Sequence, residues 1–145
     1  DFQGREELID KIIDATPHII SHNMETVRRI SPIVRSAANY ETSLTVIRRI
    51  AEKGITTKSG IMVGLGETSA EVEELMDDLR SAGCQILTIG QYLQPTRKHY
   101  PVVEYIPPLQ FDKYKEIALR KGFGQVESAP LVRSSYHAGE YATPH

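Results

Sequence analysis

The sequence is short of the residues that disulfides, metal centres and membrane spans require. Its 145 residues include one cysteine, Cys84, and no tryptophan. A single cysteine excludes an internal disulfide and any multi-cysteine metal site built by this chain alone. No run approaches the roughly twenty apolar residues of a membrane-spanning helix, and the start at Asp1 lacks the shape of a signal peptide. We therefore expect a soluble, cytoplasmic protein with no membrane partner.

An excess of positive charge is also lacking. The formal net charge is -2, and the basic pairs Arg28-Arg29, Arg48-Arg49 and Arg97-Lys98 are scattered among acidic residues. Nucleic-acid-binding proteins gather such residues into a patch or stripe, so we expect no nucleic-acid partner. With 40% hydrophobic and 25% charged residues, the chain has the composition of one globular domain.

Helical and strand patterns alternate along the chain. Apolar residues at helical spacing predict helices over Glu6–Asp14, Thr42–Lys53, from the capping box at Thr68-Ser69-Ala70-Glu71 to Gly83, and over Pro108–Lys121. Apolar or alternating runs predict strands over Pro17–Ser21, Thr56–Gly64, Cys84–Leu93 and Phe123–Ser128, with a long loop over Gln94–Pro107. The tail after Pro130 has no periodicity.

This alternation is typical of an α/β fold. Strands that alternate with helices imply right-handed crossovers and a parallel sheet. Four strands are too few to close a barrel, which usually needs about six or eight. The pattern therefore favours a piece of a larger barrel, and the alternative is a small, self-sufficient four-stranded domain.

The strand over Thr56–Gly64 has one unusual face. By strict alternation, Lys58, Gly60, Met62 and Gly64 share that face. Glycines weaken a strand unless something approaches its backbone closely, and an unpaired lysine is costly to bury. We expect this face to form a ligand floor while the opposite, apolar face packs under helices. In the alternative interpretation, Gly64-Leu65-Gly66 is only a strand-to-helix turn.

Two phosphate-binding motifs do not fit these glycines. A dinucleotide-binding fingerprint needs a third glycine where Ser69 stands. A P-loop needs glycine before its lysine, and Thr57 precedes Lys58. Neither a kinase nor an ordinary dehydrogenase is indicated.

Polar residues follow the first strand, where loops of parallel α/β proteins bind ligands. Asn23 and Glu25 lie two residues apart, so their amide and carboxylate suit the hydroxyls of a ribose. The alternative is that they cap a helix beginning near Thr26. His22 and His99 are each more typical of hydrogen-bonded structural residues than of metal ligands.

These motifs resemble a known family. Gly60-x-Met62-x-Gly64-x-x-Glu67 resembles the adenine-contacting strand of radical S-adenosylmethionine (SAM) enzymes. His22-Asn23-x-Glu25-Thr26 resembles the ribose-contacting strand of lipoyl and biotin synthases. Four runs resemble lipoyl synthases in particular: Tyr40-x-x-Ser43-Leu44, Thr57-Lys58-Ser59-Gly60, Gly90-Gln91-Tyr92-Leu93-Gln94-Pro95 with Arg97, and Arg133-Ser134-Ser135-Tyr136-His137. Small departures are Ala129, where the family usually has glycine, and Ser21, where asparagine is common.

The resemblance implies a fold and a division of the chain. Residues 1–130 would form the second half of a partial (β/α)6, TIM-like radical SAM barrel, and residues 131–145 a tail closing over the barrel end. The family holds two [4Fe-4S] clusters with six cysteines, none of which is present. Cys84 begins a hydrophobic strand and is expected to be a buried, inert thiol. The isolated chain is accordingly expected to be an inactive fragment.

The resemblance also implies site residues. Asn23 and Glu25 would hold the ribose of SAM, Ser43 would lie at the methionine carboxylate, and Gly60, Met62 and Gly64 would contact the adenine. Gln91 and Leu93 would line the floor. Lys58 shares the floor face and should meet a negative partner, either a cluster or a carboxylate.

For the tail, the resemblance implies a metal ligand. Ser134 would supply an oxygen to the auxiliary cluster, with Ser135 as the alternative ligand, and Arg133 would balance cluster or substrate charge. An oxygen ligand is harder than a thiolate, so the iron it binds should be readily lost from a cluster that donates its sulfur. The alternative is that both serines are ordinary turn hydroxyls.

The implied activity is that of a sulfurtransferase. The whole enzyme would cleave SAM reductively, and the radical so formed would take hydrogens from carbons six and eight of an octanoyl chain. The implied partners are octanoylated lipoyl carrier domains, as in 2-oxoacid dehydrogenase complexes or the glycine cleavage H protein, and an electron donor such as ferredoxin or flavodoxin. Alternatives are another radical SAM enzyme and a non-catalytic α/β binding domain.

Overall fold

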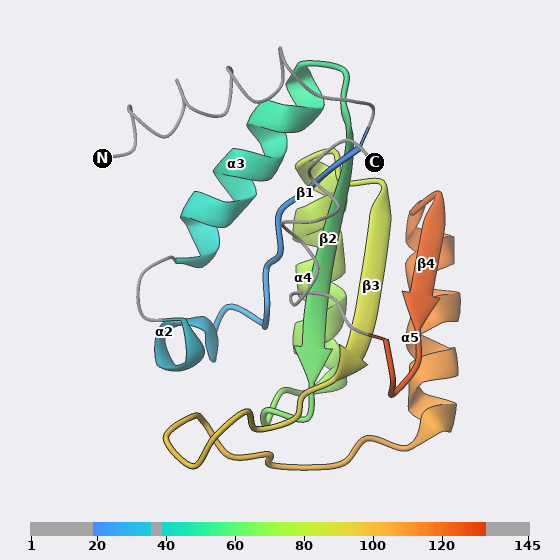
Figure 1. Ribbon diagram of the computed structural model, residues 1–145. Coiled ribbons are helices and arrows are strands. Elements are labelled where there is room, and N and C mark those ends of the chain that lie inside the picture. The colour runs from blue at the N-terminus through green and yellow to red at the C-terminus, as the bar shows by residue number, and fades with distance from the viewer. Residues whose placement is uncertain (1–18, 36–38, 133–145) are drawn as a thin grey trace.

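The computed structural model describes residues 19–35 and 39–132 of the chain. Within them, helices and strands alternate along most of the sequence (Figure 1). In chain order the elements are β1 (Ile19–Ser21), α2 (Ser31–Val34), α3 (Tyr40–Glu52), β2 (Thr56–Val63), α4 (Ser69–Ser81), β3 (Ile86–Gln91), α5 (Pro108–Lys121) and β4 (Gln125–Ser128).

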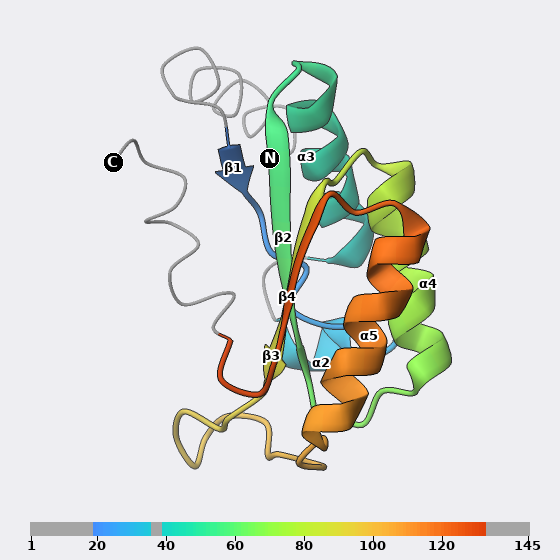
Figure 2. The ribbon, with the colours of Figure 1, turned by 90° about the vertical axis from the view of Figure 1, so that its right-hand side faces the viewer.

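The four strands form one parallel sheet in the order β1-β2-β3-β4. Each longer helix connects two neighbouring strands, and α3, α4 and α5 all lie on the same side of the sheet (Figure 2). A parallel sheet with helices outside it is the predicted α/β architecture. Of the helices in the described part of the chain, none has the length and apolar character needed to cross a membrane.

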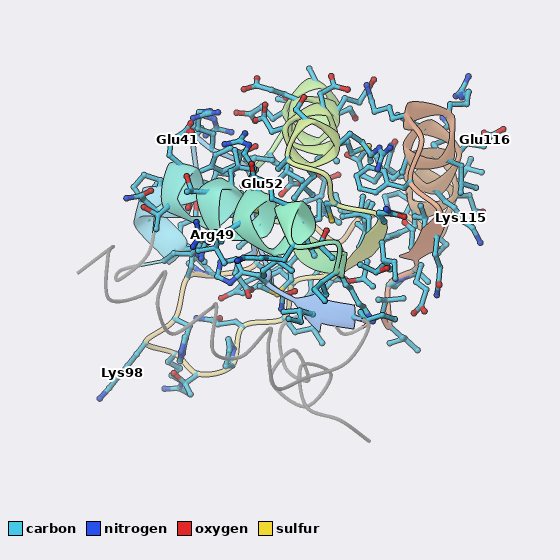
Figure 3. All side chains as sticks on the ribbon, turned by 90° about the horizontal axis from the view of Figure 1, so that it is seen from above. Glu41, Arg49, Glu52, Lys98, Lys115 and Glu116 are labelled. Carbon is cyan, nitrogen blue, oxygen red and sulfur yellow. The ribbon has the colours of Figure 1, made fainter. Side chains whose placement is uncertain are left out.

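The hydrophobic core lies between the sheet and these helices. Ile61 and Val63 of β2, together with Leu87 and Ile89 of β3, are almost completely buried and pack in one cluster with residues such as Phe111. The predicted apolar face of β2 therefore packs under helices, as expected. Charged side chains lie on the outer helices, and Figure 3 labels several of them on α3 and α5.

The opposite side of the sheet, here called the open face, has a different composition. The register places polar and small residues side by side across the strands, because partners in a parallel ladder point the same way. The residues on the open face are Ile19, Ser21, Thr56, Lys58, Gly60, Met62, Ile86, Thr88, Gly90, Gln125 and Glu127.

Local sequence signals set most of the helix boundaries. At the start of α4, the Thr68 hydroxyl accepts a hydrogen bond from the Glu71 amide at 3.2 Å, and the Glu71 carboxylate accepts one from the Thr68 amide at 2.9 Å. This is the predicted capping box. Gly83, with a φ of 95°, follows the end of α4 in the left-handed conformation expected after a helix.

Several boundaries differ from the predictions by one or two residues, and the largest differences concern β3 and α2. β3 pairs with β2 only from Ile86 to Gln91, so it is shorter than Cys84–Leu93. β3 ends at Gln91 because β2 supplies ladder partners only up to Val63, after which the chain leaves the sheet. The short helix α2 was not predicted. The predicted helix over Glu6–Asp14 lies outside the described residues.

Candidate functional site

The segment after β1 runs alongside the predicted floor strand. The His22 amide donates to the Lys58 carbonyl at 2.9 Å, and the Glu25 amide donates to the Gly60 carbonyl at 3.1 Å. The Met62 amide then donates to the Glu25 carbonyl at 2.9 Å. The backbone thus brings the two predicted SAM-contacting motifs next to each other.

Glu25 has a strained backbone. Its φ is 70°, and no other non-glycine residue in the described ranges 19–35 and 39–132 has a positive φ. The Thr26 amide donates to the Met24 carbonyl at 2.8 Å, which closes a γ-turn with Glu25 at its centre. A γ-turn with positive φ is rare and costly, and such strain clusters at ligand sites. Glu25 is therefore the residue whose conformation most strongly indicates a functional role.

The structure contradicts the helix-cap interpretation of this segment. The helix that follows is α2, whose N-cap position is Ile30, and no side chain caps it. Asn23 and Glu25 precede that position by five residues or more, because the chain first completes the turn at Glu25 and the bend after it. Neither residue caps a helix that begins near Thr26.

Ser43 is buried and lies in a partly buried polar cluster beside this segment. Its hydroxyl accepts a hydrogen bond from Arg35 Nη2 at 2.9 Å and lies 3.2 Å from His22 Nε2. Arg35 Nη1 donates to the Met24 carbonyl at 3.1 Å. The guanidinium and hydroxyl together are suited to bind a carboxylate. Arg35 was not predicted from the sequence, since a lone arginine has no periodic or spacing signal.

The Gly64 turn is held by the protein itself. Both oxygens of the Glu67 carboxylate accept from the Gly64 amide at 3.1 Å, and one accepts from the Leu65 amide at 2.9 Å. A Cβ on Gly64 would lie 2.3 Å from Gln91 Nε2 and 2.5 Å from the Glu104 carbonyl oxygen. These contacts support the strand-to-helix turn interpretation of this glycine, and its predicted contact with adenine stays a prediction.

Gln91 ends β3, and its side chain holds the loop over residues 92–107, here called the rim loop. Its Nε2 donates to the carbonyls of Tyr92 at 2.9 Å and Glu104 at 3.0 Å. Its Oε1 accepts from the Ile106 amide at 2.9 Å. The predicted floor residue Gln91 is thus used within the protein, while Leu93 lies in the rim loop with a half-exposed side chain.

After β4 the chain turns back onto the open face. The Gln91 amide donates to the Pro130 carbonyl at 3.2 Å, and the Ala129 amide donates to the Ile89 carbonyl at 3.1 Å. A Cβ on Gly90 would lie 1.9 Å from the Val132 carbonyl oxygen, so only glycine leaves room for this crossing. The predicted cluster residues Arg133 and Ser134, with the alternative Ser135, lie outside the described residues.

An arginine fixes the segment after Glu25 to the turn at the start of α4. Arg29 donates to both oxygens of Glu71 at 2.8 and 3.0 Å and to the Gly66 carbonyl at 2.9 Å. The hydrogen bonds from Arg29 and Thr68 lower the pKa of Glu71 to about 2. One carboxylate therefore both caps α4 and fastens the two candidate SAM motifs together.

Arg28 makes a second set of contacts on the outer side. Its guanidinium lies 4.4 Å from the centre of the Tyr40 ring, and its Nη2 lies 3.4 Å from an Asp78 oxygen. The Tyr40 hydroxyl donates to the same Asp78 oxygen at 2.7 Å. Burial, followed by this hydrogen bond, raises the pKa of Tyr40. These contacts join the segment to α3 and α4.

Comparison with known protein families shows to which superfamily the chain belongs. The sequence profile of the radical SAM superfamily matches residues 1–79, more than half of the chain's 145 residues. The chain belongs to the radical SAM superfamily. Its parallel sheet with outer helices is consistent with part of a radical SAM barrel, which confirms the predicted fold class.

Among curated proteins, this radical SAM chain is similar to lipoyl synthases. It is 77% identical over 141 residues to the lipoyl synthase of Bacteroides fragilis, 72% identical to that of Phocaeicola vulgatus and 60% identical to that of Treponema denticola. Each alignment covers 97% of this chain but only 49 or 50% of the relative. The chain thus spans about half the length of the curated relatives it matches.

Iron–sulfur clusters do not fit the described part of this radical SAM chain. Within residues 19–35 and 39–132, no three His, Cys, Asp or Glu side chains gather as metal ligands would. Cys84 is fully buried, and burial raises the pKa of its thiol to about 11, whereas a cluster needs thiolates. This agrees with the inert thiol predicted from the sequence.

A polar ligand does fit the open face. The hydroxyls of Ser21 and Thr88 are buried there without a hydrogen-bond partner in the described structure. Thr88 lies beside Gly60 in the register. Buried hydroxyls normally have partners, so each of these unpartnered hydroxyls marks a place where a ligand can supply one. Together with Glu25 and the Arg35–Ser43 pair, this set suits the hydroxyl, amine and carboxylate groups of SAM.

Proposed function

We propose that this chain is the SAM-binding half of a lipoyl synthase. The observation that carries the proposal is 77% identity over 141 residues to the Bacteroides fragilis lipoyl synthase. At such identity the candidate ligand residues and the contacts that hold them are expected to serve the same ligand. The strained turn at Glu25, held against Gly60 and Met62, supports this proposal.

In this proposal the chain binds and orients SAM. Asn23 and Glu25 hold the ribose hydroxyls, and Ser43 with Arg35 binds the methionine carboxylate. Gly60, Met62 and Gly64 border the adenine, and the side chain of Gln91 stabilises the Gly64 turn. The Thr88 hydroxyl is a further candidate contact, because it is buried and unpartnered beside Gly60.

The remaining parts of the activity belong to the whole protein. Bound SAM supplies, on one-electron cleavage, the carbon radical that removes hydrogen from the octanoyl chain. We propose that the cysteine ligands of both [4Fe-4S] clusters lie in the half that this chain does not span. Ser134 would contribute an oxygen ligand to the auxiliary cluster, Arg133 would balance its charge, and Lys58 would meet a negative group on the open face.

The proposed substrate is an octanoyl group on a lysine of a lipoyl carrier domain, and the product is the lipoyl group. The reaction inserts sulfur at carbons six and eight, which makes the enzyme a sulfurtransferase. A small electron-transfer protein such as ferredoxin or flavodoxin supplies the electrons for SAM cleavage. Leu93, at the start of the rim loop, is proposed to line the path of the acyl chain.

The test uses the full-length protein, reconstituted anaerobically. Glu25→Gln should weaken SAM binding by about tenfold, because a carboxylate accepts from hydroxyls more strongly than an amide does. Glu116→Gln, on the outer side of α5 (Figure 3), is the matched control and should bind like the wild type. Calorimetry measures the binding, and mass spectrometry of the carrier measures the lipoyl product.

Two results would contradict the proposal. Unchanged SAM affinity in Glu25→Gln would remove Glu25 from the site. A wild-type protein that cleaves SAM but never adds sulfur to an octanoylated carrier would show a radical SAM enzyme with a different substrate.

A further inference from the structure

The rim loop exposes an unusual amount of apolar surface. Leu93, Val103 and Tyr105 of the loop are 53%, 55% and 71% exposed, and Leu109 in the first turn of α5 is 65% exposed. These four residues, here called the rim patch, are half of the eight large hydrophobic side chains that are exposed in the described structure. Half of the exposed large apolar side chains thus lie within one stretch of 17 residues, and exposed apolar surface of this kind is a candidate interaction site.

The backbone under the rim patch is firmly held. The Gly64 carbonyl accepts from the Val103 amide at 2.8 Å and from the Glu104 amide at 3.2 Å. Gln91 holds the same stretch from its other side through Glu104 and Ile106. The exposed side chains therefore stand on a fixed backbone, which lowers the entropy cost of binding a partner.

The rim loop lies where a substrate must enter. It follows the carboxyl end of β3, and ligands of parallel α/β proteins bind at that end of the strands. Figure 2 shows the loop extending beyond the sheet toward the side opposite α4 and α5, which is the side of the open face. A molecule seated on the loop is thus next to the entrance of the candidate SAM site.

The rim loop also presents charge and a recess. Arg97 and Lys98 are exposed and have no ion pair among the described residues, and Figure 3 shows Lys98 projecting away from the body. Beside Leu109, a cavity of about 340 Å³ is lined by Glu104, Ile106 and Lys113, among others. The surface thus combines apolar anchors, a recess and unpaired positive charge.

We propose that the rim patch, with Arg97 and Lys98, is the docking surface for the protein that carries the octanoyl-lysine. This inference rests on the proposed function, in which the acyl chain arrives on a folded carrier domain. The complementary partner presents apolar side chains and carboxylates next to its acylated lysine. Apolar anchors supply most of the affinity, while opposite charges speed the encounter and fix the orientation.

The rest of the barrel is a rival occupant of this surface. It would join the sheet at an edge strand, and the edge strands of the described sheet are β1 and β4. The rim patch instead follows the carboxyl end of the inner strand β3 and continues into the first turn of α5, so it does not lie along either strand edge. The position of the patch therefore favours a separate partner.

The main experiment compares two leucines of α5 in the full-length protein. Leu109→Ser removes a rim-patch anchor, and Leu119→Ser removes an exposed leucine at the other end of the same helix. Each variant is assayed with an octanoylated carrier domain and with a short peptide bearing one octanoyl-lysine. Leu109→Ser should raise the KM for the carrier about tenfold and leave the peptide reaction unchanged. Leu119→Ser should match the wild type with both substrates.

A second pair of variants tests the charge. Lys98→Glu should slow association with the carrier domain about tenfold at low salt, and the deficit should shrink in high salt. Lys115→Glu, on the outer side of α5 (Figure 3), changes the net charge equally and should have little effect. Stopped-flow fluorescence with a labelled carrier measures the rate.

The outcomes separate docking from the proposed function. Equal losses with carrier and peptide in Leu109→Ser, or equal effects of the two leucine variants, would overturn the docking proposal. A large drop in thermal stability of Leu109→Ser would assign the patch to the rest of the barrel and also overturn it. Wild-type protein that makes no lipoyl product from either substrate would instead refute the proposed function, and the carrier-binding rates would still report on docking.

Discussion

Glu25 adopts an unfavourable backbone conformation next to the candidate site. Its backbone amide and carbonyl are both hydrogen-bonded to β2, at Gly60 and Met62. These hydrogen bonds fix a γ-turn that most residues avoid. The sequence indicated the side chain but not the strain, because a positive φ at a glutamate has no local signature. Arg35 was missed for a similar reason, since its partners Met24 and Ser43 are distant in sequence.

Replacement of Glu25 separates the effect of its backbone strain on stability from the effect of its side chain on SAM binding. Glu25→Gly should stabilise the protein by about 1 kcal/mol, because glycine adopts positive φ without a steric penalty. The same variant should bind SAM less tightly. Asn23→Gly is the control, and it should be destabilising because Asn23 has no positive φ to relieve. Urea denaturation measures the change in stability of both variants. A loss of stability in Glu25→Gly would show that its side chain, not its backbone, dominates.

At the scale of elements, predictions were best where the signal is local. α5 occupies Pro108–Lys121, as predicted, and α4 begins at its capping box. Both depend on residues within a few positions of the helix end. The end of β3 was misplaced because it is set by pairing with β2, and the role of Gln91 depends on a loop partner 15 residues away.

The start of α4 should depend on pH through Glu71. The pKa of this carboxyl is lowered to about 2 in the folded chain. Its ionised form therefore contributes fully to the free energy of unfolding when the pH is above the ordinary pKa near 4.5. That contribution is lost as the pH falls from about 5 toward 2, because protonation then favours the unfolded chain. Glu71→Gln should cost about 1 kcal/mol at pH 7 and almost nothing near pH 2. Denaturant titrations across this range measure the difference, and a constant difference would contradict the assignment.

The crossing of Val132 over Gly90 should not tolerate a side chain. Gly90→Ala should destabilise the protein by about 1 to 3 kcal/mol and speed hydrogen exchange at the Gln91 amide, which bonds to Pro130. Gly124→Ala is a matched control, because its Cβ would meet only the Gln85 carbonyl at 3.8 Å. Equal effects of the two variants would mean that the crossing does not constrain position 90.

At the scale of the whole molecule, the one-sided arrangement of helices was predictable but its consequences for the site were not. Strand and helix alternation along the chain gave the parallel sheet, and alternation within β2 gave its two faces. The site, however, is assembled from the ends of β1 and β2, the start of α3 and the chain after β4. Which of these segments touch follows from packing across the sheet, and no short stretch of sequence encodes it.

The isolated chain should self-associate. Among the described residues, β1 has a strand neighbour only on its β2 side, and Ile19 at this edge is 40% exposed. Unpaired strand edges recruit other chains. Sedimentation velocity should therefore show mass rising with concentration for the chain alone but not for the full-length protein. A chain that stays monomeric at high concentration would argue that this edge is already protected.

Gln91 is joined to two segments that reach the site from opposite directions. Its backbone amide is hydrogen-bonded to Pro130, which precedes the predicted cluster ligand Ser134 in the sequence. Its side chain is hydrogen-bonded to the rim loop, where we propose that the carrier docks. A shift of that loop would therefore reach Pro130 through the Gln91 side chain and the hydrogen bond of its backbone amide. In the proposed function, the binding of the carrier and the position of the sulfur-donating cluster would then be coupled through Gln91, and a shorter residue at this position would uncouple them.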